Sequence, residues 1–184
     1  MFSDELKSCT MHAHAGLEKK LVARIKRVKS VNDYIDLLKV MYGYYKPLQE
    51  KIQPKVSENI TVRYADDILN DIRDLGSSNN HIPVCSRTPS LNSHASVLGA
   101  LYVTEGSTLG GRIITKIIVK QLNLPSEKGF SFFNAYGNDT EIMWEKFKRV
   151  LNLPRPQIEQ AEVKKAAIDT FSTFNDWITE NDRN

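Results

Sequence analysis

The sequence lacks most features that mark secreted, membrane or nucleic-acid-binding proteins. Its two cysteines, Cys9 and Cys85, are too few for a disulfide framework and fit a reducing cytoplasm. No run approaches the ~18 consecutive apolar residues of a membrane span, and residues 1–14 lack the apolar core and cleavage pattern of a signal peptide. The formal charge of +3 is too small by itself to indicate a nucleic-acid partner. We therefore expect a soluble, cytoplasmic protein that binds neither membrane nor nucleic acid.

What remains is the composition of a globular protein. A hydrophobic share of 41% excludes a disordered chain. A length of 184 residues suits one domain with a substantial core. We expect residues 1–184 to form a single domain.

Apolar residues recur at steps of three or four along most of the chain, and this spacing predicts helices. A capping-box sequence, Ser30 to Asp33, opens the second helix, and Pro47 is expected to kink or interrupt it. No segment shows the alternation of a strand. The prediction is an all-α fold with about six main helices. The expected helices cover residues 3–29, 30–52, 61–75, 91–122, 139–151 and 157–179, with loops over 81–90 and 123–138.

Two of the four histidines lie in the first predicted helix. At about 100° per residue, His12 and His14 point roughly 200° apart, so only one can lie on the apolar face. His14 lies between Thr10 and Leu17, within the apolar stripe, and His12 is on the opposite side. A histidine on such a face is either a core residue with satisfied hydrogen bonds or a ligand, and the stripe alone leaves both open.

Two charged residues accompany His14 on the same helix. Glu18 follows one turn later, where a carboxylate can accept a hydrogen bond from the imidazole, as the partner of an iron-bound histidine does. Lys7 precedes His14 by two turns on nearly the same face, where a cation suits an acidic ligand group. A histidine and a glutamate four residues apart are equally an ordinary surface contact.

Four of the nine glycines fall inside the longest predicted helix, at Gly99, Gly106, Gly110 and Gly111. Each costs about 1 kcal/mol relative to alanine in a helix interior. The spacing of seven and four places the first three on one face. A bare face admits a ligand to the backbone and permits a bend, although small residues at this spacing also serve close helix packing.

Together the histidine and the glycines suggest a planar metal-containing cofactor. An imidazole on one helix would coordinate the metal, and the bare glycine helix would cover the opposite side without a side chain in the way.

Several motifs resemble those of bacterial haem oxygenases, especially the ones associated with bacteriophytochromes. Leu-Tyr-Val-Thr-Glu-Gly-Ser-Thr-Leu-Gly-Gly at 101–111 is similar to the distal-helix motif of that family. Thr-Met-His-Ala-His-Ala-Gly-Leu-Glu at 10–18 is similar to its proximal-helix pattern. The resemblance continues in order through residues 42–48, 132–137 and 143–144, and so spans nearly the whole chain.

The resemblance implies a helical fold with haem between proximal and distal helices, and the oxidative cleavage of haem by O2 to biliverdin, CO and iron. Haem would be both substrate and cofactor, with His14, rather than His12, as the axial ligand to iron. Glu18 would be its hydrogen-bond partner, and Lys7 and Tyr102 match positions that meet the haem propionates. The distal glycines Gly106, Gly110 and Gly111 would let the helix backbone approach the haem.

One position departs from the wider family. Animal members have an aspartate directly after the first distal glycine, where it organises water around bound oxygen, whereas this chain has Ser107. The resemblance leaves open whether backbone groups near Gly106 or the Ser107 hydroxyl order this water. The same departure sustains an alternative function, a haem-binding or haem-sensing protein without turnover. A third hypothesis, a thiaminase-like helical enzyme with another ligand, is opposed by the His14–Glu18 pair and the glycines.

The remaining expectations concern partners and packing. No flavin or nucleotide fingerprint appears, so electrons would come from an external donor such as a ferredoxin, a flavodoxin or a reductase. Basic residues between Lys19 and Lys29 form either a solvated helix face or a docking patch for that donor. Trp144, Phe171, Phe174 and Trp177 and the aromatic residues at 130–136 are expected mainly in the core. We expect a monomer or a weak dimer.

Overall fold

The computed structural model describes residues 1–78, 81–124 and 128–182. Within these residues the chain is helical and contains no strand, which confirms the predicted all-α fold. No helix in this part of the chain is long and apolar enough to cross a membrane. The α-helices are α1 (Phe2–Arg27), α2 (Val31–Ile52), α3 (Asp66–Asp74), α4 (His94–Gly106), α5 (Thr108–Leu122), α6 (Thr140–Leu151) and α7 (Gln157–Asn181), with 3₁₀ turns η1 (Gln53–Lys55) and η2 (Gly137–Asp139).

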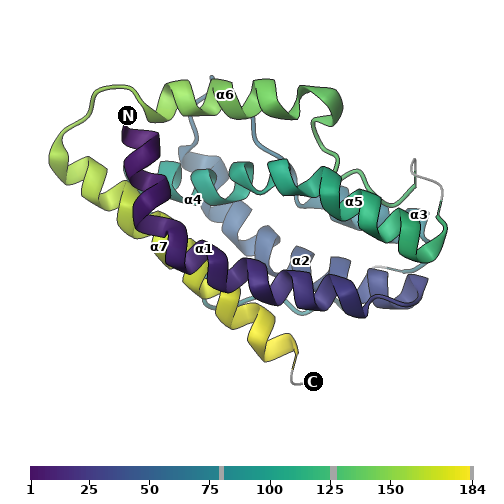
Figure 1. The fold of residues 1–184 in the computed structure, drawn as a ribbon. Coiled ribbons are helices and arrows are strands. Elements are labelled where there is room, and N and C mark those ends of the chain that lie inside the picture. The colour runs from purple at the N-terminus through teal and green to yellow at the C-terminus, as the bar shows by residue number, and fades with distance from the viewer. Residues whose placement is uncertain (79–80, 125–127, 183–184) are drawn as a thin grey trace.

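The long C-terminal helix α7 supports both α4 and α1, which pack against it along much of their length (Figure 1). Gly99 allows the close approach of α4, because a Cβ there would lie only 2.3 Å from the Val163 carbonyl oxygen and 2.8 Å from the Ala166 Cβ. Helix α1 packs mainly on α7 rather than on α4 or α5. Since α7 holds both, α1 and α4 keep a fixed relation to each other.

Helix α2 begins as predicted. The Ser30 side chain accepts a hydrogen bond from the Asp33 amide (3.2 Å), and the Asp33 carboxylate accepts one from the Ser30 amide (2.8 Å). This reciprocal capping box satisfies two amides that have no partner within the helix.

The sequence predicted that Pro47 would kink or interrupt α2, and the interruption does not occur. A proline lacks the amide that would bond to the carbonyl four residues earlier, here that of Gly43. The Cys85 amide, from the loop after α3, donates to the Gly43 oxygen instead (2.8 Å). The lost helical bond is thus replaced by a tertiary one, and the helix continues to Ile52.

The segment predicted as one helix over 91–122 forms two helices, and Ser107 lies between them. The Ser107 amide still bonds to the Val103 carbonyl four residues back (3.1 Å), but the Gly110 amide bonds to the Ser107 carbonyl only three residues back (3.2 Å). The regular pattern therefore breaks beside Gly106, where two of the helix-weakening glycines lie close together.

The third helix is shorter than the predicted 61–75, because its first residues are held in an extended path. The Arg63 amide donates to the Glu105 carboxylate of α4 (3.4 Å), and the Ala65 amide donates to the Gln49 side chain of α2 (2.6 Å). Acceptors on other helices take amides that a helical turn would have used, so α3 begins only at Asp66.

Candidate functional site

The candidate ligand histidine lies on α1 at the edge of the contact with α7. His14 is exposed, and its ring packs against that of Phe171, with 5.2 Å between the ring centroids. Thr10 and Leu17, one turn away on either side, are buried. His12 is also exposed, and it lies on the other side of α1 from that stripe. His14 thus combines a packed ring with an accessible edge, which a metal ligand requires.

The two charged neighbours of His14 both lie in solvent. Lys7 and Glu18 are exposed. In the described part of the chain no side-chain hydrogen bond joins Glu18 to His14, although one helical turn separates them. The predicted partnership of these two side chains therefore stays a prediction.

The four clustered glycines meet different surroundings, so the two explanations that the sequence left open apply to different members of the group. At Gly99 the space that a side chain would take is occupied by α7. At Gly111 it is occupied by the loop before η2, where a Cβ would lie 2.1 Å from the Phe133 carbonyl oxygen. At Gly106 a Cβ would meet only the Trp144 ring, at 3.4 Å, and at Gly110 it would meet nothing within 4 Å. The packing explanation applies to the first pair and, through the Trp144 ring, also to Gly106, so Gly110 is the one of the four that faces open space.

An apolar stripe continues from Gly110 along α5. Leu109, Ile113 and Ile117 are respectively 41%, 61% and 39% exposed. They recur at steps of four, so they lie on one side of the helix next to Gly110. An exposed apolar stripe marks a surface that contacts a ligand, another protein or a membrane.

A tyrosine connects the two sides of this site. Tyr102 of α4 lies one turn before Gly106, and its ring packs against Trp144 of α6, with 5.7 Å between centroids. Burial raises the pKa of Tyr102, and a side-chain hydrogen bond with Thr10 of α1 opposes that shift. Thr10 in turn lies one turn before His14. Helix α1 and the α4–α5 pair run in the same general direction in Figure 1.

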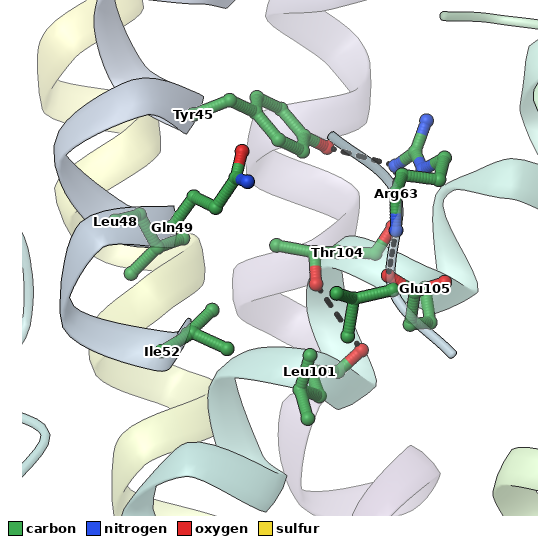
Figure 2. Close-up of a pocket in the computed structure, with 9 residues that line it drawn as sticks. Tyr45, Leu48, Gln49, Ile52, Arg63, Leu101, Thr104 and Glu105 are labelled. Carbon is green, nitrogen blue, oxygen red and sulfur yellow. Dashed lines mark hydrogen bonds between the residues drawn. The ribbon is translucent and has the colours of Figure 1, made fainter. Parts of the chain in front are cut away.

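The Arg63 guanidinium lies behind the break between α4 and α5, and the sequence did not predict a role for it. Arg63 is only 8% exposed, and its Nη2 donates to the Thr104 carbonyl (2.5 Å) and to the Ser107 hydroxyl (2.6 Å). Its Nη1 donates to the Phe132 carbonyl (3.2 Å). The Tyr45 hydroxyl lies 3.4 Å from Nη2 and 3.0 Å from the Ser107 hydroxyl, so it joins the same network (Figure 2).

The Ser107 hydroxyl is fully engaged in this network. It receives the hydrogen bond from Arg63, contacts Tyr45, and donates to the Thr104 carbonyl (2.7 Å). A hydroxyl offers one donor and two acceptor sites. Ser107 therefore stabilises the end of α4 on the side that faces α2, where Tyr45 lies.

Glu105, directly before Gly106, is the acidic member of the same region. It is 5% exposed, and its Oε2 accepts a hydrogen bond from the Tyr136 hydroxyl (2.7 Å). Burial raises the pKa of this carboxyl, while the positive charge of Arg63 and the bond from Tyr136 oppose the rise. A cavity of about 20 Å³ lies between Glu105, Arg63 and the side chains of α2 (Figure 2), large enough for one water molecule.

The loop before η2 is itself fixed from behind by a buried carboxylate. Asp71 of α3 accepts hydrogen bonds from the amides of Ser131 (2.7 Å) and Phe132 (2.9 Å). This holds the Phe132 carbonyl against Arg63 and the Phe133 carbonyl against Gly111. The predicted packing role is confirmed for Phe130, Phe132 and Phe133, which are buried, whereas Tyr136 is half-buried and bonds to Glu105.

Of the four aromatic residues placed in the core from the sequence, Phe171, Phe174 and Trp177 are buried. Trp144 is half-buried and stands against Gly106 instead.

The basic run on α1 divides into two groups. Lys20 bonds to the Thr179 hydroxyl, and Arg24 pairs with Asp182 (2.6 Å), so both tie α1 to the end of α7. Lys19 and Lys26 line an open groove of about 450 Å³ together with Val22. Lys19 and Lys26 have the exposure that a docking patch needs, as do Arg27, whose side chain is 65% exposed, and Lys29.

Comparisons with known proteins bear on the family and the fold of the chain. A family model described as "Heme oxygenase" matches residues 63–180. Among curated proteins, no sequence matches the chain significantly.

Three solved structures share the fold over nearly the whole chain. One is a haem oxygenase from Neisseria meningitidis, solved with bound NO and CO; it has 22% identity and a TM-score of 0.80, with 98% of this chain and 92% of that one covered. Haem oxygenase-1 from the cyanobacterium Synechocystis sp. PCC6803, in complex with haem, has 18% identity and a TM-score of 0.77, with 97% and 91% covered. The haem oxygenase from Leptospira interrogans has 18% identity and a TM-score of 0.76, with 97% and 98% covered. Because the family model covers more than half of its length, the chain belongs to the haem oxygenase family.

Proposed function

We propose that this protein cleaves haem, using O2 and electrons from an external donor, to biliverdin, CO and iron, with His14 as the axial ligand. The observation that carries the proposal is the placement of an exposed imidazole, packed on Phe171, on α1 and of bare backbone at Gly110 on α5, where a Cβ would meet nothing within 4 Å. Family membership supports the reaction type.

The residues present fit a porphyrin. At Gly110 there is room where any side chain would project, and Leu109, Ile113 and Ile117 supply an apolar surface for the flat ring. His14 supplies a neutral nitrogen ligand, the type that holds iron in oxygen-binding proteins. Haem, when bound, supplies the iron that activates O2 and the ring that is oxidised.

Each remaining residue has a positioning task in this proposal. Glu18, one turn from His14, would accept a hydrogen bond from the second ring nitrogen and so fix the tautomer that binds metal. Lys7 and Tyr102 would meet the propionates. Gly106 and Gly110 would bring backbone rather than side chain to the distal side of the haem, while Gly111 serves the packing against Phe133.

The electron donor would dock on the exposed part of α1. Lys19 and Lys26 border the groove next to Glu18, and an acidic ferredoxin, flavodoxin or reductase would complement their charge. In this proposal the protein works as a monomer or weak dimer.

One observation favours a second candidate function, haem binding without turnover. The Ser107 hydroxyl takes the place of the animal enzymes' aspartate, and its hydrogen-bonding capacity is already used by Arg63, Tyr45 and Thr104. If backbone groups near Gly106 do not order water in its place, the bound haem would be stable under O2.

A single experiment separates the two functions. Purified protein is mixed with hemin, a reductant is added under air, and the absorption spectrum is followed. Decay of a histidine-ligated Soret band into a biliverdin spectrum supports haem cleavage. A persistent Soret band supports the second function, and no Soret band contradicts both.

A further inference from the structure

Burying a guanidinium behind a helix break is costly, and Arg63 is held there by more contacts than a surface arginine makes. Its Cζ lies 4.4 Å from the centroid of the Phe132 ring and 5.5 Å from that of Tyr45, so the cation lies beside two aromatic rings that also contact each other. Its Nε has no hydrogen-bond partner among the described residues. A buried guanidinium is unfavourable unless neighbouring groups compensate its charge and accept its hydrogen bonds.

The geometry that Arg63 supplies is a fork. The carbonyl of Thr104 lies in the last turn of α4, where carbonyl groups lack helical partners and carry partial negative charge. One nitrogen of the guanidinium reaches this carbonyl and the Ser107 hydroxyl, and the other reaches the Phe132 carbonyl of the neighbouring loop. A lysine has a single charged nitrogen and cannot span the three acceptors in fixed directions.

We propose that Arg63 is a positioning residue for the distal side of the site, because it ends α4 at Gly106 and holds Ser107 toward α2. Its side chain keeps the Ser107 hydroxyl and the loop at Phe132 on the back of the break. The backbone of Gly106 and Gly110 is thereby presented to the ligand in one fixed arrangement. The link to catalysis rests on the proposed haem oxygenase function, whereas the link to the helix break does not.

The role in the break is tested without haem, by amide hydrogen exchange measured by NMR. In Arg63→Met, exchange at Ser107 and Gly110 should accelerate by at least about 10-fold relative to the amides of α7, because a local opening affects only the segment that loses its support. In Arg63→Lys the acceleration should be intermediate, since the charge remains but the fork is lost.

Arg155 offers a matched control. Its guanidinium also donates to a carbonyl in the last turn of a helix, that of Val150 in α6 (2.9 Å), and lies 5.5 Å from the centroid of the Phe2 ring. Arg155→Met should accelerate exchange near the end of α6 and leave Ser107 and Gly110 unchanged. Equal acceleration at all amides in Arg63→Met, or the same acceleration at Ser107 in Arg155→Met, would overturn the proposal.

The role in the reaction is tested with hemin. For Arg63→Met, the hemin dissociation constant should change less than about threefold, while turnover per bound haem should fall at least about 10-fold, because positioning affects the reaction more than binding. Unchanged turnover per bound haem would show that Arg63 supports the fold alone. If the wild-type protein binds no hemin, the proposed function fails, and the exchange experiment still decides whether Arg63 holds the break.

Ser107→Ala tests whether Arg63 acts on the break through the Ser107 hydroxyl. It removes the hydroxyl that Arg63 holds but keeps the guanidinium, so it should accelerate exchange at Gly110 less than Arg63→Met does. Both changes act on one network. Adding Ser107→Ala to Arg63→Met should therefore accelerate exchange at Gly110 by less than Ser107→Ala accelerates it in the wild-type protein. Full additivity of the two effects would contradict a network that acts through Ser107.

Discussion

The two sides of the candidate site are built in opposite ways. On α1, His14 and Glu18 are exposed and form no side-chain hydrogen bond within the described residues. Behind α4 and α5, Arg63 and Glu105 are buried, and they fix the break at Ser107 through several tertiary hydrogen bonds. The distal side is thus organised before any ligand binds, whereas the proximal side offers a ligand atom on an otherwise regular helix. Substitutions should therefore affect ligand binding alone on α1, but both stability and binding on α4–α5.

The largest effect on function is expected at His14. His14→Ala should reduce turnover by more than about 100-fold, because even the partners of metal ligands contribute about 10- to 100-fold. The melting temperature of the haem-free protein should change little, since the ring is exposed and loses only its contact with Phe171. Hemin titration, biliverdin formation and thermal unfolding measure the three quantities.

His12→Ala is the control for this experiment. It removes an imidazole two residues away on another side of α1 and should leave hemin binding and turnover unchanged. Loss of activity in His12→Ala with an active His14→Ala would show that the ligand had been assigned to the wrong histidine.

On the distal side, two adjacent glycines should respond in opposite directions. Gly111→Ala places a Cβ 2.1 Å from the Phe133 carbonyl oxygen, a backbone atom that Asp71 helps to fix, so the free energy of unfolding should fall by about 3 kcal/mol. Gly110→Ala places its Cβ in open space and should raise the free energy of unfolding by up to about 1 kcal/mol, through helix propensity.

Gly110→Ala should have opposite effects on the stability of the haem-free protein and on its affinity for hemin. The methyl group of Gly110→Ala stabilises the haem-free protein but projects where the haem is proposed to lie, so hemin affinity should decrease. Denaturant unfolding and hemin titration on the same samples measure both. Unchanged hemin affinity in Gly110→Ala would place the ligand elsewhere.

The sequence predicted most of the helices and both motif segments, because these depend on local patterns. Apolar spacing located α1, α6 and α7 within a few residues, and the cap at Ser30 marked the start of α2. The continuity of α2 through Pro47 was missed, since it depends on the Cys85 amide, which approaches only in the folded chain.

The supporting network was missed for the same reason. Arg63 is an isolated basic residue between Val62 and Tyr64, and nothing in its local sequence indicates burial. Tyr45 lay within a recognised motif but carried no assigned role. Glu105 likewise lay within the distal-helix motif without an assigned role. Their contacts join residues 18 to 69 positions apart, so no helical or strand period contains them.

The smallest expected effect concerns the pH dependence of stability at Glu105. Burial raises the pKa of this carboxyl in the folded protein above its ordinary value of 4.5. As pH rises through the interval between these two pKa values, the unfolded chain loses its proton first, so the wild-type protein loses stability. A glutamine does not titrate, so the free energy of unfolding of Glu105→Gln, relative to the wild type, should increase as pH rises from below 4.5 toward neutrality.

Tyr136→Phe removes the hydrogen bond that favours the ionised form of Glu105, so the stability of this variant should fall further with pH than that of the wild type. Denaturant unfolding across this pH range measures both differences. A difference between Glu105→Gln and the wild type that stays constant or shrinks with pH would mean that Arg63 keeps Glu105 ionised, and that the distal side contains a stable buried charge pair.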